Sequence, residues 1–180
     1  MNNQLFITTS RLIITSLSLA DDSFILELVN TEGWIRFIGN RNVGSLNEAR
    51  AYIEKIINNE NISYWVVGLA DSLEKIGIVT FIKRDYLDHH DIGFAILPAF
   101  SKKGYAYEAT LGVLKELIKE YQLQRILATT LPANTNSIKL LQKLGFVFEK
   151  EIEIGKEKLH VYGADGDKFD GDAVASDRIV

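Results

Sequence analysis

AFSKKGYAYEA, residues 99–109, lies between two segments whose apolar patterns differ. The preceding DIGFAILP is typical of a β-strand that stops at Pro98, which cannot donate a hydrogen bond to a ladder. After Gly104 the apolar residues recur at helical spacing as far as Tyr121. This order of strand, short loop and helix start is typical of a phosphate-binding site, because the first N–H groups of a helix lack intrahelical partners. Taken alone, a lysine-lysine-glycine turn is more often a solvated connection, and neither GxxxxGK[ST] nor GxGxxG occurs in the sequence.

The remaining apolar patterns predict a mixed α/β fold, an α+β arrangement of one mixed sheet with helices on both faces. Strands are expected where β-branched and aromatic residues cluster, and helices where apolar residues follow a 3.6-residue period or a capping pair such as Ser45 and Glu48. The predicted strands span residues 12–17, 64–70, 76–84, 91–97, 125–131, 146–154 and 158–163. The predicted helices span residues 18–30, 34–38, 45–60, 104–121 and 136–144.

Length and composition limit the class of protein. The 180 residues suffice for one domain with a sizeable core, and 47% hydrophobic with 24% charged residues is ordinary for a soluble protein. The net charge of −4 does not favour nucleic acid, and the absence of cysteine excludes disulfides and thiolate sites. No signal peptide and no apolar run of about 20 residues is visible, so no membrane span is expected and a cytoplasmic location is the default.

The chain is predicted to divide into a domain, residues 1–163, and an acidic tail, residues 164–180. The tail ADGDKFDGDAVASDRIV is rich in aspartate and lacks apolar periodicity, so a mobile, solvated segment is expected. A calcium site is disfavoured there, because the third aspartate arrives one residue later than the EF-hand spacing requires.

The loop segment resembles the acyl-CoA-binding segment of the GNAT superfamily of N-acetyltransferases. That family's pattern is Q/R-x-x-G-x-G/A, and here Ser101 stands at the Gln/Arg position, followed by Gly104 and Ala106 at the two small-residue positions. ANTNSIKLLQKLGF is similar to the family's next block, an N-x-x-S followed by a helix ending in GF, with Asn134 and Ser137 at the first and last positions of N-x-x-S.

A third segment, TSRLIITSL at residues 9–17, looks like the opening strand of the ribosomal-protein N-acetyltransferase branch of that superfamily. The resemblance covers residues 8–163 in matching order, a length typical of one domain. It implies the GNAT acyl-CoA N-acyltransferase fold. In that fold a mostly antiparallel central sheet is splayed between its fourth and fifth strands to admit the pantetheine arm of acetyl-CoA.

The resemblance therefore implies an acetyl-CoA site without a metal. Loop N–H groups would hold the pyrophosphate, and strand residues would pair with the pantetheine amides as an added strand does. Ser101 lacks the usual long polar side chain and Lys102 replaces a common glycine, so a competent loop is expected to give Lys102 an ordinary negative φ. The implicated residues are Ala95, Ile96, Leu97, Ser101, Lys102, Lys103, Gly104, Tyr105, Ala106 and Asn134.

Acetyl transfer also needs a polarised carbonyl, a neutral amine and a proton for the leaving thiolate. A backbone N–H near Ile96 or Leu97 is expected to polarise the carbonyl. The resemblance points to Ser137 as the acid. Asn134 and Ser137 are also residue types preferred at helix starts, so helix capping alone is the alternative.

The base stays open at this point. Asp91 and His90 precede the strand at a place where the family often carries an acid or imidazole facing the substrate, and a solvated loop is the alternative for either. A metal site at the same histidines is disfavoured, because adjacent histidines point apart on a strand. Further candidates for the base are Glu149, Glu151 and Glu153.

The primary hypothesis is an acetyl-CoA-dependent N-acetyltransferase that acts on a primary amine, either a protein N-terminus or a small amine. The alternative is a catalytically silent module of the same fold that binds acyl-CoA or a protein partner. Within enzymes, a different acyl group such as succinyl is the second option. No nucleic-acid or membrane partner is expected, and no self-complementary patch decides whether the chain forms a homodimer.

Overall fold

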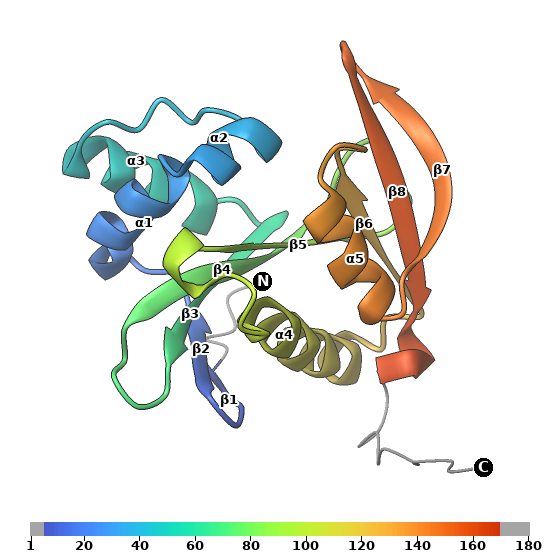
Figure 1. Cartoon of the computed structure of the whole chain (residues 1–180), viewed down its shortest axis with the longest axis horizontal. Helices are drawn as coiled ribbons and strands as arrows, with labels where there is room; N and C mark the ends of the chain where they lie inside the picture. The colour runs from blue at the N-terminus through green and yellow to red at the C-terminus, as the bar shows by residue number, and fades with distance from the viewer. Residues whose placement is uncertain (1–5, 170–180) are drawn as a thin grey trace.

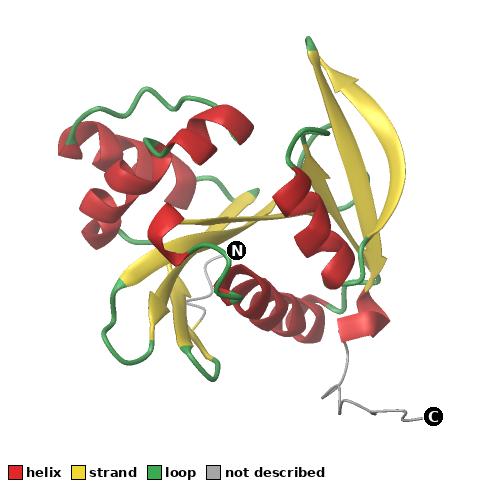
Figure 2. Cartoon of the chain, in the orientation of Figure 1, coloured by secondary structure: helices red, strands yellow, loops and turns green. Residues whose placement is uncertain are grey.

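A computed structural model describes residues 6–169, which form one eight-stranded sheet with helices on both faces (Figure 1, Figure 2). The strands are β1 (Phe6–Thr8), β2 (Leu12–Ser16), β3 (Ile62–Leu69), β4 (Lys75–Ile82), β5 (Asp91–Ile96), β6 (Arg125–Thr130), β7 (Val147–Ile154) and β8 (Glu157–Asp165). The helices are α1 (Asp22–Val29), α2 (Glu32–Phe37), α3 (Leu46–Ile57), α4 (Tyr105–Tyr121) and α5 (Thr135–Lys143), with the short 3-10 helices η1 (Leu19–Asp21), η2 (Pro98–Phe100) and η3 (Gly166–Phe169). The strand order is β1-β2-β3-β4-β5-β6-β8-β7, and every neighbouring pair is antiparallel except β5–β6.

One face of the sheet is covered by α1, α2 and α3. Ser45 is the N-cap of α3: its hydroxyl accepts the Glu48 N–H at 3.3 Å, and the Glu48 carboxylate accepts the Gly44 N–H at 2.7 Å. The predicted capping role of Ser45 is confirmed. Behind these helices, Ile53 of α3 and Ile78 of β4 are buried in one apolar cluster, which fixes the three helices against the sheet.

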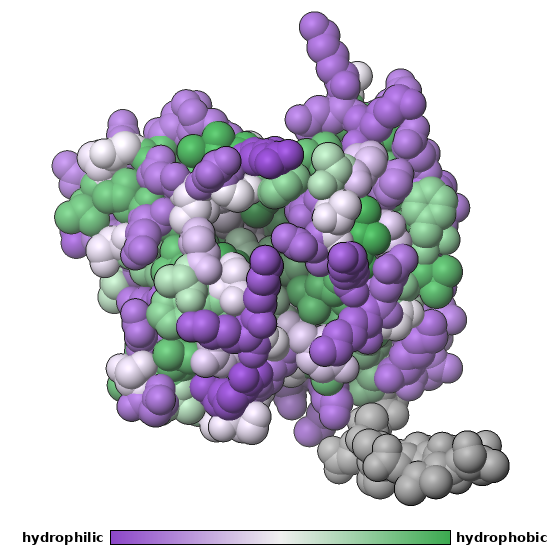
Figure 3. Space-filling view, in the orientation of Figure 1, coloured by the Kyte–Doolittle hydropathy of each residue, from purple (hydrophilic) through white to green (hydrophobic). Residues whose placement is uncertain are grey.

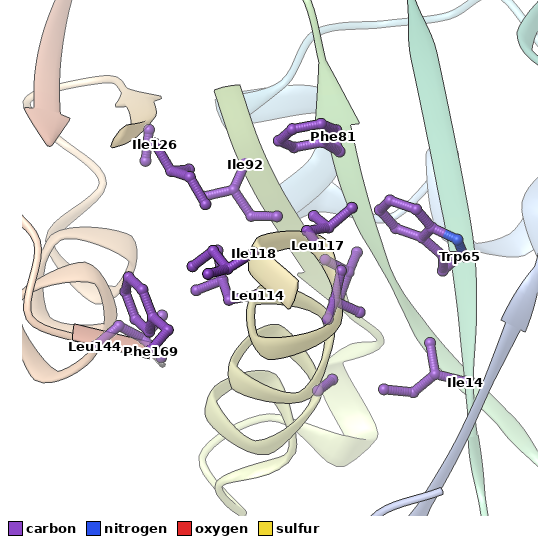
Figure 4. Close-up of a cluster of buried hydrophobic side chains, with 14 of the residues drawn as sticks. Ile14, Trp65, Phe81, Ile92, Leu114, Leu117, Ile118, Ile126, Leu144 and Phe169 are labelled. Carbon is purple, nitrogen blue, oxygen red and sulfur yellow. The ribbon is translucent and has the colours of Figure 1, made fainter. Parts of the chain in front are cut away.

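The opposite face carries α4 and α5. Leu114 and Leu117 of α4 are buried in the same apolar cluster as Trp65 of β3 and Ile92 of β5 (Figure 4). Full burial of a leucine side chain contributes about 1.5–3 kcal/mol. This cluster therefore fixes the position of α4, and with it the loop that precedes α4, relative to β5.

Strands β5 and β6 share one ladder position and then diverge. Asp91 is the register partner of Leu127, and the Leu127 N–H donates to the His90 carbonyl at 2.9 Å. Beyond this pair the two strands have no further register partners within residues 6–169. The sheet thus opens into a fork between β5 and β6. The predicted splay between strands four and five is confirmed, since these strands become β5 and β6 once β1 is counted.

Two expectations about the ends of the domain are corrected. The sequence patterns did not predict β1, whose Phe6 is 68% exposed and gives no alternation signal. Residues 164–169 were expected in the tail, but β8 continues to Asp165 and Phe169 is buried, with its ring centroid 6.0 Å from that of Phe146. The other residues of the predicted tail lie outside the described range.

Candidate active site

The backbone of β5 turns its polar groups toward the fork at every second residue. Alternate residues of an antiparallel strand point their N–H and C=O groups to opposite edges. The Leu97 N–H donates to β4 at 2.8 Å, and alternation directs Ala95 the same way. The His90 carbonyl, by contrast, accepts a bond from β6, so the groups of Phe94 and Ile96 point into the fork. An inserted extended chain would meet these two residues.

This alternation separates the strand residues that the sequence grouped together. Of Ala95, Ile96 and Leu97, only Ile96 directs its backbone into the fork, and the Leu97 N–H is already bonded to the Ile76 carbonyl. Phe94 was missed by the sequence reasoning. The signal that would have found it is the register of β4 against β5, which the sequence pattern alone does not supply.

The loop between β5 and α4 ends at Gly104, the N-cap of α4, with a φ of 84°. Positive φ is natural for glycine, and a Cβ added there would lie 3.3 Å from the Arg11 guanidinium. The Glu108 N–H donates to the Gly104 carbonyl at 3.1 Å and so begins the helical pattern. The N–H groups of Tyr105 and Ala106 precede that bond and have no intrahelical acceptor. The start of α4 thus offers N–H donors and the positive end of a helix dipole to an anion.

Lys102 corrects a sequence expectation, because its φ is 61° and not negative. The left-handed conformation costs a residue with a Cβ about 1–2 kcal/mol, which explains why a glycine was expected at this position. Lys102 and Gly104 are both left-handed and flank Lys103. Turns of this kind gather successive N–H groups into a concave anion site. Ser101 contributes a hydroxyl that donates to the Leu97 carbonyl at 3.4 Å.

Asp91 lies at the base of the fork and is 3% exposed. Its carboxylate accepts the Arg84 Nε–H at 2.8 Å, the Thr129 N–H at 2.8 Å and the Thr129 hydroxyl at 3.1 Å. Burial raises the pKa of Asp91, against the lowering effect of Arg84 and Thr129. Because the carboxylate binds a backbone N–H of β6, it stands in for a ladder hydrogen bond where the two strands separate. The sequence patterns did not predict that Arg84 and Thr129 bind Asp91, because each lies on a different segment of the chain from the strand that Asp91 begins.

His90 directly precedes β5, and alternation along the chain places its side chain on the face opposite to Asp91. Its ring stacks on Phe81, with the centroids 4.4 Å apart and the planes 9° from parallel, and Phe81 belongs to the cluster beneath α4. Burial, helped by the charges of Lys83 and His89, lowers the pKa of His90 below 6.5. The imidazole is therefore neutral near pH 7 and able to accept a proton.

Asn134 and Ser137 lie at the start of α5, which flanks β6 (Figure 1). The Asn134 side chain is the N-cap and accepts the Ser137 N–H at 3.2 Å. Capping is therefore carried by Asn134. The half-buried Ser137 hydroxyl makes no hydrogen bond to another residue of the 6–169 range.

The three glutamates considered as bases lie on β7, the outer strand beyond β8. Glu149 pairs with Arg125, and Glu151 accepts from Lys158 at 2.9 Å. Glu153 lies 3.9 Å from the same ammonium group. Glu149 reaches past β8 to Arg125 at the start of β6, which is the closed end of the fork, and Glu151 and Glu153 lie beside Lys158 of β8, so none of the three lies at the open part of the fork.

The molecular surface is hollowed between the lobe of α1–α3 and the lobe that contains α5 (Figure 3). Apolar residues floor this hollow and hydrophilic residues surround it. In residues 6–169, no group of three or more His, Asp and Glu side chains could hold a metal ion. None of the described helices has the length and apolar character needed to cross a membrane.

Comparison with known proteins assigns this arrangement to a family. A family model described as an acetyltransferase (GNAT) domain matches residues 11–147, which include both strands of the fork, the loop and α5. The chain belongs to the GNAT acetyltransferase family. The uncharacterized N-acetyltransferase YnaD of Bacillus subtilis is 31% identical over 155 residues, covering 84% of this chain and 90% of YnaD.

Solved GNAT structures share the fold. A spermidine N-acetyltransferase from Vibrio cholerae in complex with CoA and spermine has a TM-score of 0.76 at 21% identity, covering 89% of this chain and 99% of that one. A ribosomal-protein-S5-alanine acetyltransferase from Vibrio fischeri has a TM-score of 0.77 at 19% identity, covering 93% of this chain and 100% of that one. At these identities the likeness shows the fold, and the mixed sheet with its β5–β6 fork is the GNAT sheet.

Proposed function

We propose that the protein transfers the acetyl group of acetyl-CoA to a primary amine by direct attack in a ternary complex. The observation that carries the proposal is the β5–β6 fork with an N–H-rich loop at its open end. GNAT acetyltransferases use acetyl-CoA, and a related structure contains CoA. The residues present here fit that group, because Phe94 and Ile96 turn their backbone groups into the fork, where they have no strand partner within residues 6–169, and the loop offers donors to an anion.

The donor would lie along β5. Loop N–H groups from Ser101 to Ala106 would hold the pyrophosphate, with Lys102 and Lys103 adding positive charge. The pantetheine arm would then run into the fork, where Phe94 and Ile96 offer the backbone pairing of an added strand. The amide nitrogen of Asn134 is a further donor toward the arm, since its oxygen is used for capping.

Two groups supply the chemistry at the thioester. We assign polarisation of the acetyl carbonyl to a fork-facing N–H group, that of Ile96 or Phe94, because the Leu97 N–H is already bonded to β4. The attacking amine forms the new C–N bond while the C–S bond breaks. Ser137 is the proposed donor of the proton to the leaving thiolate, and this role is supported by its hydroxyl, which makes no hydrogen bond to another residue of the 6–169 range.

The base candidates receive different roles. We assign Asp91 to positioning, because its carboxylate is bonded to Arg84 and Thr129 and joins the two strands at the base of the fork. His90 is the proposed proton acceptor, directly or through water. It directly precedes Asp91 at the closed end of the fork, and its imidazole is neutral near pH 7.

The acceptor class rests on the relatives. One solved GNAT neighbour is named for spermidine and another for the alanine of ribosomal protein S5, which supports a small polyamine or a protein N-terminus as the acceptor. The TSRL segment supports the ribosomal-protein branch, and the hollow between the two lobes is the proposed place of the acceptor.

A thiol-release assay with acetyl-CoA tests the proposal directly. Spermidine and a peptide beginning with alanine serve as acceptors, and mass spectrometry identifies the acetylated amine. Turnover of either one supports the proposal. Binding of acetyl-CoA without turnover across a broad amine panel, and no effect of Ser137→Ala on that binding, would instead identify a catalytically silent module.

A further inference from the structure

The turn between β1 and β2, residues Thr9, Ser10 and Arg11, converges on one carboxylate of α4. Glu108 Oε1 accepts the Thr9 hydroxyl at 2.6 Å, the Ser10 hydroxyl at 2.9 Å and the Arg11 N–H at 2.9 Å. Glu108 lies in the first turn of α4, directly after the candidate pyrophosphate loop. A turn almost a hundred residues earlier in the chain therefore anchors the start of this helix.

Arg11 extends the anchor across the loop itself. Its Nε and one terminal nitrogen each lie 2.7 Å from Glu108 Oε2, and its other terminal nitrogen donates to the Lys103 carbonyl at 3.0 Å. The guanidinium also lies 4.6 Å from the centroid of the Tyr105 ring. Arg11 thus contacts residues on both sides of Gly104 and holds a planar, multiply bonded geometry that a lysine could not reproduce.

The negative charge of Glu108 lies beside the candidate pyrophosphate site and is paired with Arg11. A carboxylate beside an anion-binding helix start would repel a pyrophosphate. Burial alone would raise the pKa of Glu108, but the hydrogen bonds from Thr9, Arg11 and Ser10 hold it below its usual value, so the group is ionised. Its side chain is 15% exposed, and both of its oxygens accept hydrogen bonds from the turn, so its charge is paired with the Arg11 guanidinium.

We propose that the Arg11–Glu108 pair, with Thr9 and Ser10, is a positioning device for the loop of residues 101–106 and sets its affinity for the pyrophosphate of the donor. The inference rests on the proposed function. It makes the β1–β2 turn a part of the donor site, although no residue of that turn belongs to the fork. Its effect should be confined to donors that carry a pyrophosphate.

Calorimetric binding of two thioesters tests this inference without an identified acceptor. Acetyl-CoA carries the pyrophosphate, whereas S-acetylpantetheine carries only the arm that enters the fork; competition against acetyl-CoA gives the constant for the weaker ligand. Glu108→Gln and Arg11→Lys are expected to raise the Kd of acetyl-CoA about tenfold, and to leave the Kd of S-acetylpantetheine within about twofold. Thermal unfolding without ligand establishes that each variant is folded.

A matched ion pair controls for the general loss of a salt bridge. Arg50 Nε lies 2.6 Å from Asp22 and joins α3 to α1, so Asp22→Asn removes a comparable surface pair away from the loop and should change neither Kd. Equal weakening of both thioesters in Glu108→Gln, or no weakening of acetyl-CoA, would overturn the inference. Failure of the wild-type protein to bind acetyl-CoA at all would instead remove the proposed function, and this inference with it.

Discussion

Replacing Asp91 probes the base of the fork, where one carboxylate takes the place of a ladder hydrogen bond. In Asp91→Ala the Thr129 N–H and hydroxyl lose their acceptor in a half-buried site, and Arg84 loses its ion pair. In Asp91→Asn an amide oxygen can still accept the Thr129 N–H, while the charge is lost. The two variants therefore separate the backbone anchor from the ion pair.

The structure sets the size of each effect. Loss of the acceptor for a half-buried N–H and hydroxyl costs about 1–2 kcal/mol. The ion pair contributes about 0.5 kcal/mol, because the Arg84 side chain is 36% exposed and can turn to water. We expect Asp91→Ala to lower the free energy of unfolding by about 2 kcal/mol and Asp91→Asn by about 1 kcal/mol.

Urea unfolding measures these free energies, and the thiol-release assay measures kcat on the same samples. Asp88→Ala is the matched control, because Asp88 is exposed in the same segment and should change neither quantity. As a positioning residue, Asp91 should lose less than about tenfold in kcat when changed to asparagine, whereas a general base would lose about 100-fold or more. A stability of Asp91→Ala equal to that of the wild type would refute the reasoning about the fork.

Three further predictions concern the loop and the catalytic candidates. Lys102→Gly should be more stable than Lys102→Ala by about 1 kcal/mol in urea unfolding, because only glycine accepts the positive φ without strain; the opposite order would mean an ordinary φ. Burial lowers the pKa of His90, so below about pH 6.5 the unfolded chain binds a proton that the folded protein resists, and stability falls as the pH falls. His90→Phe keeps the stack on Phe81 and should weaken that acid-side decline, which equal pH profiles would contradict. Ser137→Ala should lower kcat about 100-fold with little change in the KM of acetyl-CoA, and an unchanged kcat would leave Ser137 without a catalytic role.

The sequence patterns predicted those parts of the fold and of the site that depend on residues close together in the chain. The β5 segment, its stop at Pro98 and the glycine at the start of α4 are signals within a few residues, and the structure has the predicted strand, loop and helix there. The strand-to-helix order was likewise predictable from the change of apolar period. Local signals were enough because each element buries one face against the same sheet.

Contacts between residues far apart in the chain could not be predicted from the sequence patterns. Asp91 was recognised as a candidate site residue, but its partner Thr129 is 38 residues away. No local sequence pattern predicts that a carboxylate will bind the backbone of the neighbouring strand. The Glu108 anchor depends on a contact with Thr9 across 99 residues. Phe169 shows the same limit at the end of the domain, since one aromatic residue in an acidic segment gives no period, yet it is buried.

Amide hydrogen exchange with and without acetyl-CoA tests whether the donor inserts between β5 and β6. We predict that acetyl-CoA slows exchange at Phe94 and Ile96, whose N–H groups point into the fork, and at the loop N–H groups up to Ala106. Ala95 and Leu97 should change little, because their N–H groups point toward β4. Protection of all four strand amides alike, or of none at saturating acetyl-CoA, would contradict the insertion of the donor between β5 and β6.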